Sequence, residues 1–161
     1  MDVYDFAMQF EKDGENFYRE GARLSANKGL RTILIMLADA EVAHYNTFKG
    51  MKEHSPFQPA ESPILKDVKN VFVRMKEEGD LEGIEVSELS LYKKAQEIEK
   101  RTEEFYLEKA SSIENSSEQE IFLRVAGEEK KHYFILQQII DFVSRPTHWL
   151  ENAEWYHLEE Y

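Results

Sequence analysis

The sequence contains no cysteine, and this absence excludes several kinds of redox and metal site. Without a thiol the chain forms no disulfide, no zinc–thiolate site, no iron–sulfur cluster and no four-cysteine iron site. Any metal ion bound by side chains of this chain must therefore be held by oxygen and nitrogen ligands.

Glycine and proline are also scarce, with seven and four residues in a chain of 161. Long helical periodicities of apolar and polar residues run between these few breaks, which predicts an all-α fold. There is no apolar run of about 18 residues, and the first residues begin an amphipathic pattern, not a charged-then-apolar signal sequence. We therefore expect a cytoplasmic protein with no membrane segment.

The chain has fewer basic residues than acidic residues, and its formal net charge is −12. This charge argues against nucleic acid as the main partner, and its simplest role is solubility. Hydrophobic residues make up 42% of the sequence, and the length suits one domain over residues 1–161.

The tetrapeptide Glu41-Val42-Ala43-His44 recurs 88 residues later as Glu129-Lys130-Lys131-His132. The same displacement relates positions in the preceding helices and in the turn between them. Ala7, Glu11, Glu15, Phe17, Tyr18 and Asn27 correspond to Ala95, Glu99, Glu103, Phe105, Tyr106 and Asn115. One constant offset over two helices and a turn indicates an internal duplication of a helical hairpin.

The two predicted hairpins cover residues 2–53 and 87–144. In the first, helices are expected at 2–26 and 28–53, with Asn27 as the cap between them. In the second, they are expected at 87–112 and 117–144, with Ser116 and Gln119 as a capping box. The expected fold is thus a four-helix bundle of two repeats.

The connection over residues 54–86 is far longer than neighbouring helices need, so we expect it to travel the length of the bundle. Within it, Ser62-Pro63 is typical of a helix start, and a short amphipathic helix from Ile64 should end near Gly79 and pack on the bundle. The tail over residues 145–161 is expected to form one short helix and then irregular structure, with its aromatic residues covering the bundle end or contacting another subunit.

Four glutamates interrupt the apolar stripes of the four long helices. Burying a lone carboxylate costs several kcal/mol unless it is paired, protonated or coordinated, and neither stripe carries a Lys or Arg to pair with these four. Glutamate and histidine three residues apart lie one turn apart on a helix and can hold one ion together. The predicted ligands are Glu11, Glu41, His44, Glu99, Glu129 and His132.

Four carboxylates balance two divalent ions, and this stoichiometry suits two metals bridged by two of the carboxylates. Oxygen donors with two imidazoles favour iron or manganese over copper, and no thiolate is available to favour zinc. The sequence therefore predicts a dinuclear metal site.

This pattern resembles the ferritin-like di-iron carboxylate superfamily, in which two helices supply one Glu each and two supply Glu-x-x-His. Within that superfamily the chain is most similar to the rubrerythrin-type branch. The resemblance covers residues 2–144 and implies that the six residues are metal ligands, with Glu41 and Glu129 as the bridging pair. The chain departs from rubrerythrin proper in having no rubredoxin iron site and in carrying Thr102 where an extra carboxylate is expected.

Four further residues are candidates for contacts around these ligands. A metal-bound carboxylate or imidazole needs an outer hydrogen-bond partner, and the Tyr18 and Tyr106 phenols have suitable spacing, although buried tyrosines are commonly only core residues. Glu15 and Glu103 lie one turn after the predicted ligands Glu11 and Glu99. They either contact the ligands from outside or lie on a solvated helix face.

We expect an oxidoreductase that reduces O₂ or H₂O₂ at a di-iron site, with electrons from a separate donor protein. Side-chain nucleophiles or bases are not needed, because the metal ligands carry the chemistry. Two alternatives remain: non-enzymatic binding, storage or buffering of iron or manganese, and an interaction module in which metals are structural or absent. A homodimer is the default oligomer for such a bundle with an exposed aromatic tail.

Overall fold

The computed structural model describes residues 1–55, 63–151 and 158, and the regular secondary structure in these ranges is helical. None of the helices in this part of the chain has an apolar stretch long enough to cross a bilayer. The helices are α1 (Val3–Leu24), α2 (Lys28–Glu53), α3 (Ile64–Glu78), a 3₁₀ turn (Val86–Glu88), α4 (Leu89–Ser112), α5 (Ser116–Ser144) and α6 (Pro146–Glu151).

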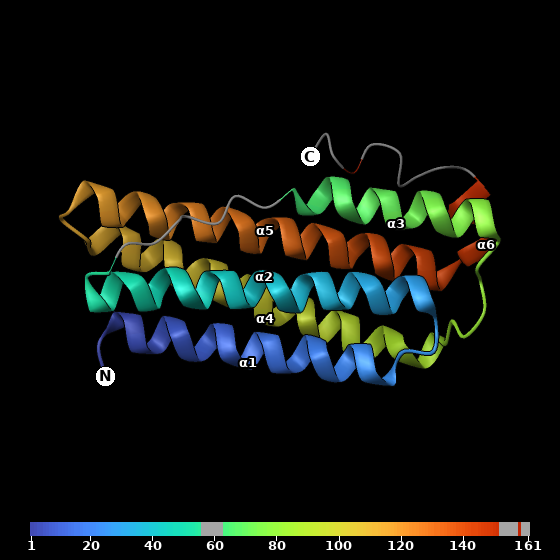
Figure 1. Ribbon diagram of the computed structural model, residues 1–161, viewed down its shortest axis with the longest axis horizontal. Coiled ribbons are helices and arrows are strands. Elements are labelled where there is room, and N and C mark those ends of the chain that lie inside the picture. Colours follow the sequence, from blue (N-terminus) through green and yellow to red (C-terminus); the bar gives the residue numbers. More distant parts are fainter. Residues whose placement is uncertain (56–62, 152–157, 159–161) are drawn as a thin grey trace.

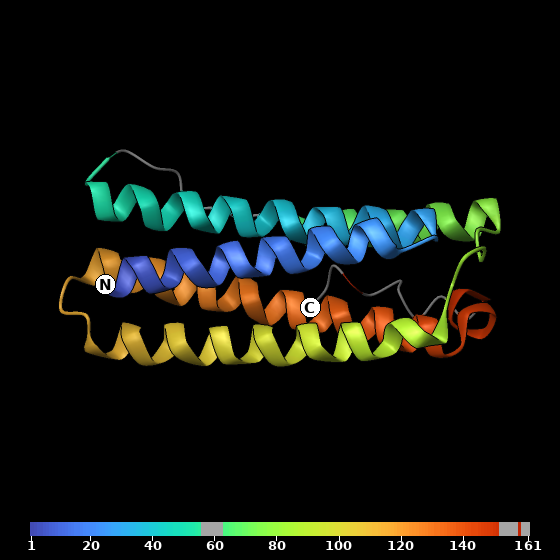
Figure 2. The same cartoon turned by 90° about the horizontal axis from the view of Figure 1, so that it is seen from below.

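Two antiparallel hairpins, α1–α2 and α4–α5, make up a four-helix bundle (Figure 1). The view from below shows α1 and α4 next to each other along the bundle (Figure 2), and α2 likewise contacts α5. Helix α1 runs in the opposite direction to α4, as a two-fold relation across the bundle axis requires. The predicted all-α bundle of two repeated hairpins is confirmed.

The crossover carries the chain from the end of α2 back to the opposite end of the bundle, where α4 begins (Figure 1). Its helix α3 packs against α2 and α5 through an apolar face that includes Val68 and Phe72. It ends at Gly79, which takes a left-handed conformation with φ of 63°. The predicted short helix and its end are confirmed, whereas Ser62 lies outside the described residues and Pro63 makes no side-chain cap.

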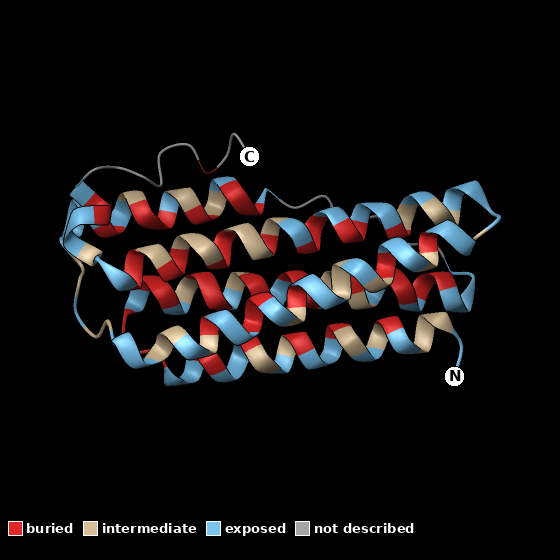
Figure 3. Cartoon of the chain, turned by 180° about the vertical axis from the view of Figure 1, so that it is seen from behind, coloured by how far each residue is buried: buried red, intermediate tan, exposed pale blue. Residues whose placement is uncertain are grey.

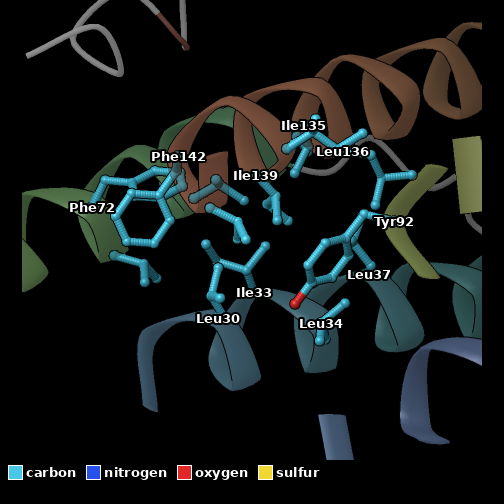
Figure 4. Packing of buried hydrophobic residues seen from close by; sticks show 14 of the residues in the cluster. Leu30, Ile33, Leu34, Leu37, Phe72, Tyr92, Ile135, Leu136, Ile139 and Phe142 are labelled. Carbon is cyan, nitrogen blue, oxygen red and sulfur yellow. The ribbon is translucent and has the colours of Figure 1, made fainter. Parts of the chain in front are cut away.

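Buried residues face inward from all four long helices, and exposed residues lie on the outer faces (Figure 3). Along each hairpin the apolar residues form two separate clusters. In the larger cluster, Leu30, Ile33, Leu34 and Leu37 of α2 meet Ile135, Leu136, Ile139 and Phe142 of α5, with Phe72 and Tyr92 beside them (Figure 4). The smaller cluster contains Ala7, Phe48, Tyr106 and Phe122.

The helix caps match the sequence expectation in the first repeat and differ in the second. Asn27 caps α2 by accepting a hydrogen bond from the Leu30 backbone N–H at 2.9 Å. In the second repeat the cap is the equivalent Asn115, which accepts from Ser117 and Glu118, so the predicted Ser116–Gln119 capping box is wrong. Asparagine one residue earlier satisfies the free N–H groups of the first turn, and this leaves Ser116 inside the helix.

The tail begins with α6, which packs back onto the bundle end. Trp149 is fully buried, with its ring 4.5 Å from that of Phe72 and 5.5 Å from that of Phe142. It covers the bundle end, so the premise of an exposed aromatic tail, on which the predicted dimer rested, does not hold for Trp149. Trp155, Tyr156 and Tyr161 lie outside the described residues.

Candidate metal centre

The six predicted ligand residues lie between the two apolar clusters, at mid-length of the bundle. On α2, Glu41 and His44 follow Leu37 of the larger cluster and precede Phe48 of the smaller one. Helix α5 has the same order in reverse. All six side chains are at most 3% exposed: Glu11, Glu41, His44, Glu99, Glu129 and His132.

Each imidazole faces a carboxylate from the other repeat. The His44 Nδ1 lies 2.9 Å from Glu129 Oε1, and the His132 Nδ1 lies 3.1 Å from Glu41 Oε1. The two rings stack with centroids 5.6 Å apart and an interplanar angle of 12°. The duplication therefore produces one shared centre built from both hairpins, and not two separate sites.

Glu11 on α1 and Glu99 on α4, called the outer glutamates below, approach the same nitrogens. Glu11 Oε2 lies 3.4 Å from His44 Nδ1, and Glu99 Oε1 lies 3.4 Å from His132 Nδ1. Each histidine thus faces one carboxylate from the other helix of its own hairpin and one from the other hairpin.

These residues form two groups, and in each group one ligand atom per residue lies within 4.8 Å of all the others. The first is Glu11, Glu41, His44 and Glu129, and the second is Glu41, Glu99, Glu129 and His132. Metal–ligand bonds of about 2.0–2.2 Å place opposite ligand atoms about 4.4 Å apart, so both groups have the dimensions of a metal site.

Several buried polar atoms in these groups have no hydrogen-bond partner within the described part of the chain. They include Glu11 Oε2, Glu99 Oε2 and His132 Nε2. Buried polar atoms in proteins are almost always satisfied, and an unpartnered carboxylate oxygen is costly. The donor set of four carboxylates and two imidazoles, with carboxylate oxygens left unpaired, fits two metal ions.

The surroundings push the carboxylate pKa values in two directions. Burial and repulsion from Glu11 and Glu99 raise the pKa of Glu41 well above its usual range, and burial with the same repulsion does so for Glu129. Burial also raises the pKa of Glu99, but hydrogen bonds from Glu129, His132 and Tyr18 outweigh burial. The pKa of Glu99 therefore falls to about 2. The metal-free centre therefore holds protons on its two shared carboxyls.

The surroundings also favour the protonated form of His44 in the metal-free protein. Burial disfavours its cation, but attraction to Glu11 outweighs burial and raises the pKa of His44, while the pKa of Glu11 is lowered. Without metal, these protons supply part of the positive charge that four buried carboxylates need. Metal binding must displace them, which makes binding pH-dependent.

Both candidate tyrosines hydrogen-bond to outer glutamates, and each does so across the repeat. The Tyr106 hydroxyl on α4 donates to Glu11 Oε1 on α1 at 2.7 Å. The Tyr18 hydroxyl on α1 donates to Glu99 on α4. Both phenols therefore contact predicted ligands in addition to filling the core.

Glu15 and Glu103 lie outside both ligand groups. Glu15 makes surface ion pairs with Lys12 at 3.1 Å and Arg19 at 2.8 Å. Glu103 lines a different groove, between α4 and α5, together with Lys100 and Lys130. The two ion pairs of Glu15 place its carboxylate against basic side chains of its own helix.

One residue beside the centre was missed by sequence reasoning. Glu128, next to Glu129 on α5, is only 6% exposed, and its Oε1 accepts a hydrogen bond from Lys131 at 3.0 Å. The equivalent position in the first repeat is Ala40, so the duplication carried no signal for it.

Replacing Tyr106 with phenylalanine is expected to weaken metal binding by about 10–100-fold, because outer hydrogen bonds orient metal ligands. Tyr18→Phe should have a similar effect through Glu99. Chelator competition with Co(II) or Fe(II) measures the change. Tyr92→Phe is the matched control, since Tyr92 is also fully buried on α4 but donates to Glu88 instead. Unchanged affinity in both Tyr106→Phe and Tyr18→Phe would show that these phenols only fill the core.

In the comparison with known families, a family model described as rubrerythrin matches residues 2–140. This range contains all six clustered residues and ends near the end of α5. The comparisons with curated proteins and with solved structures returned no match.

Proposed function

The chain belongs to the rubrerythrin family, and from this membership and its paired ligand groups we propose that it is a dinuclear non-haem iron oxidoreductase. Its substrate is O₂ or H₂O₂. The six clustered residues, Glu11, Glu41, His44, Glu99, Glu129 and His132, are its metal ligands, with manganese as the alternative metal.

One observation carries this proposal. Glu41 and Glu129 belong to both ligand groups, whereas each of the other four residues belongs to one. Two metal ions, one in each group, would therefore share two carboxylates. This sharing supports Glu41 and Glu129 as the bridging pair and supports two ions per chain.

The remaining ligands complete the two ends of the centre. Glu11 with His44 would hold one ion and Glu99 with His132 the other, and each outer carboxylate is kept in place by a tyrosine hydroxyl. Burial of all six side chains excludes bulk water, so electrostatic interactions within the site are strong.

Two iron ions held by these residues would supply electrons for reduction of an oxygen–oxygen bond. Reduction of H₂O₂ to two molecules of water consumes two electrons and two protons. Because the chain has no cysteine for an iron–sulfur or rubredoxin-type site, we propose that a separate donor protein returns the electrons.

The test is to load the protein with Fe(II) without oxygen, measure metal content, and then add H₂O₂ or O₂. Oxidation of both irons, followed by repeated turnover with a chemical reductant, supports the oxidoreductase. Uptake of about two ions per chain without turnover supports the alternative of metal binding or buffering. Uptake of many irons per chain supports storage, and absence of any uptake contradicts the dinuclear site.

A further inference from the structure

The face formed by α1 and α4 carries a groove of about 480 Å³ directly outside the ligand centre. This is the face on which these two helices are neighbours in Figure 2. Phe10 and Phe105 pack edge to face in it, with ring centroids 4.9 Å apart. The groove is lined by Phe10, Asp13, Ile98, Arg101, Thr102 and Phe105.

A second, much smaller cavity lies behind the groove. Its volume of about 10 Å³ leaves room for roughly one water-sized molecule. Three carboxylates of the centre line it, namely Glu41, Glu99 and Glu129. A small molecule that entered this cavity would therefore meet the predicted ligands.

The groove and the inner cavity share three residues, Phe10, Ile98 and Thr102. All three are partly exposed, unlike the ligands behind them. They form a wall one side chain thick between solvent and the carboxylates. Small rotations of such side chains occur on the picosecond-to-nanosecond scale and open a path for small molecules.

Position 102 and its repeat equivalent, position 14, both line the inner cavity. At Gly14 an added Cβ would lie only 3.0 Å from Glu41 Oε2, so the absence of a side chain leaves space for that carboxylate. At Thr102 the side chain is retained, and its hydroxyl donates to the Ile98 carbonyl at 2.9 Å. Thr102 is thus a fixed, small wall residue on the side of the cavity that faces the groove.

We propose that the α1–α4 groove is the entrance to the centre and that Thr102, with Ile98, limits passage to small neutral molecules such as H₂O₂ and O₂. Bulky organic hydroperoxides are excluded because the inner cavity is small and small rotations of the wall side chains make room only for molecules little larger than water. Anions are disfavoured because the shared wall includes the apolar side chains of Phe10 and Ile98, so a charged molecule crossing it would lose its hydration. This inference rests on the proposed function, since it assigns a route to the same centre.

The test uses nitric oxide, a neutral diatomic molecule, and follows its association with the Fe(II)-loaded protein by stopped-flow absorption. Thr102→Phe should leave iron content near that of the unchanged protein but slow association by at least about tenfold. Ile98→Trp, one turn earlier on the same wall, should act in the same way. Gln137→Phe is the matched control, because it adds the same ring in the α4–α5 groove.

The complementary variant is Thr102→Ala, which replaces a side chain of the wall between groove and cavity by a smaller one. It should increase turnover of methyl hydroperoxide, a molecule one carbon larger than H₂O₂ that we expect the unchanged protein to reduce slowly, while the rate with H₂O₂ changes by less than about threefold.

Iron content distinguishes a failure of the proposed function from a failure of the proposed route. If the unchanged protein takes up no iron, the proposed function fails and the route fails with it. If iron is bound but neither bulky variant slows nitric oxide, the route is wrong and the function stands. Loss of iron in both bulky variants also contradicts the route, since the wall would then be part of the ligand scaffold.

Discussion

Replacing Glu41 and Glu129 together by glutamine is expected to reduce metal content from about two ions per chain to well below one. Both carboxylates belong to both ligand groups, so each ion loses two charged ligands at once. Loss of an outer hydrogen bond costs about 10–100-fold in affinity, and loss of two direct ligands should cost more than about 1000-fold. Metal analysis after loading and desalting measures the result.

The same double variant should fold normally without metal. In the metal-free protein burial raises the pKa of both side chains, so each is a neutral acid that a glutamine amide replaces at nearly the same size. Glu15→Gln with Glu103→Gln is the matched control, because this repeat-related pair lies outside the ligand groups. Two ions per chain in the Glu41→Gln, Glu129→Gln variant would contradict the bridging assignment.

The metal-free protein is expected to lose stability as the pH rises above about 5, and metal should reverse this trend. Glu41, Glu129 and His44 all have raised pKa values in the folded chain, so above their usual values the folded state holds more protons than the unfolded state. Their contribution is present at low pH and is lost as the pH rises through the raised values. Each such proton gives a slope of about 1.4 kcal/mol per pH unit.

Glu11 and Glu99 act in the opposite sense but outside this window. Their lowered pKa values stabilise the fold above the usual carboxyl value, and that contribution is lost only as the pH falls towards the folded value, about 2 for Glu99. They therefore affect stability in acid, not above about pH 5.

Metal binding should displace about three protons per chain, from Glu41, Glu129 and His44. Affinity consequently rises with pH, and bound metal at 100 times its Kd adds about 2.7 kcal/mol to the free energy of unfolding. Urea titrations at several pH values with and without Co(II), and calorimetry in buffers of different ionisation enthalpy, measure both effects. A metal-free stability that rises across this pH window would contradict the assigned protonation.

The reciprocal contacts explain why a duplicated hairpin makes one centre. Tyr106 of the second repeat holds Glu11 of the first, and Tyr18 of the first holds Glu99 of the second. The histidines cross in the same way, His44 to Glu129 and His132 to Glu41. Neither hairpin alone contains a complete set, so metal binding should couple their association.

The sequence by itself determined the helical architecture and the six candidate ligands. Helical periodicity and the constant displacement between Glu41–His44 and Glu129–His132 are local or one-dimensional properties, so they can be read without coordinates. The same holds for the Asn27 cap and for the end of α3 at Gly79, because caps depend on a few adjacent residues. The second cap was misassigned by one residue, since Asn115 and Ser116 are both good caps and only the backbone decides between them.

The tertiary structure alone decided which groups meet across the bundle. Glu15 and Tyr18 have equally suitable positions along α1, yet only Tyr18 points to a ligand, because the approach of α4 determines which face of α1 is buried. Likewise the sequence shows Gly14 and Thr102 as small residues one turn after the outer glutamates, but not that they line one cavity beneath a surface groove. Contacts of this kind depend on the relative placement of helices about 90 residues apart in the chain, and periodicity within a helix does not encode that placement.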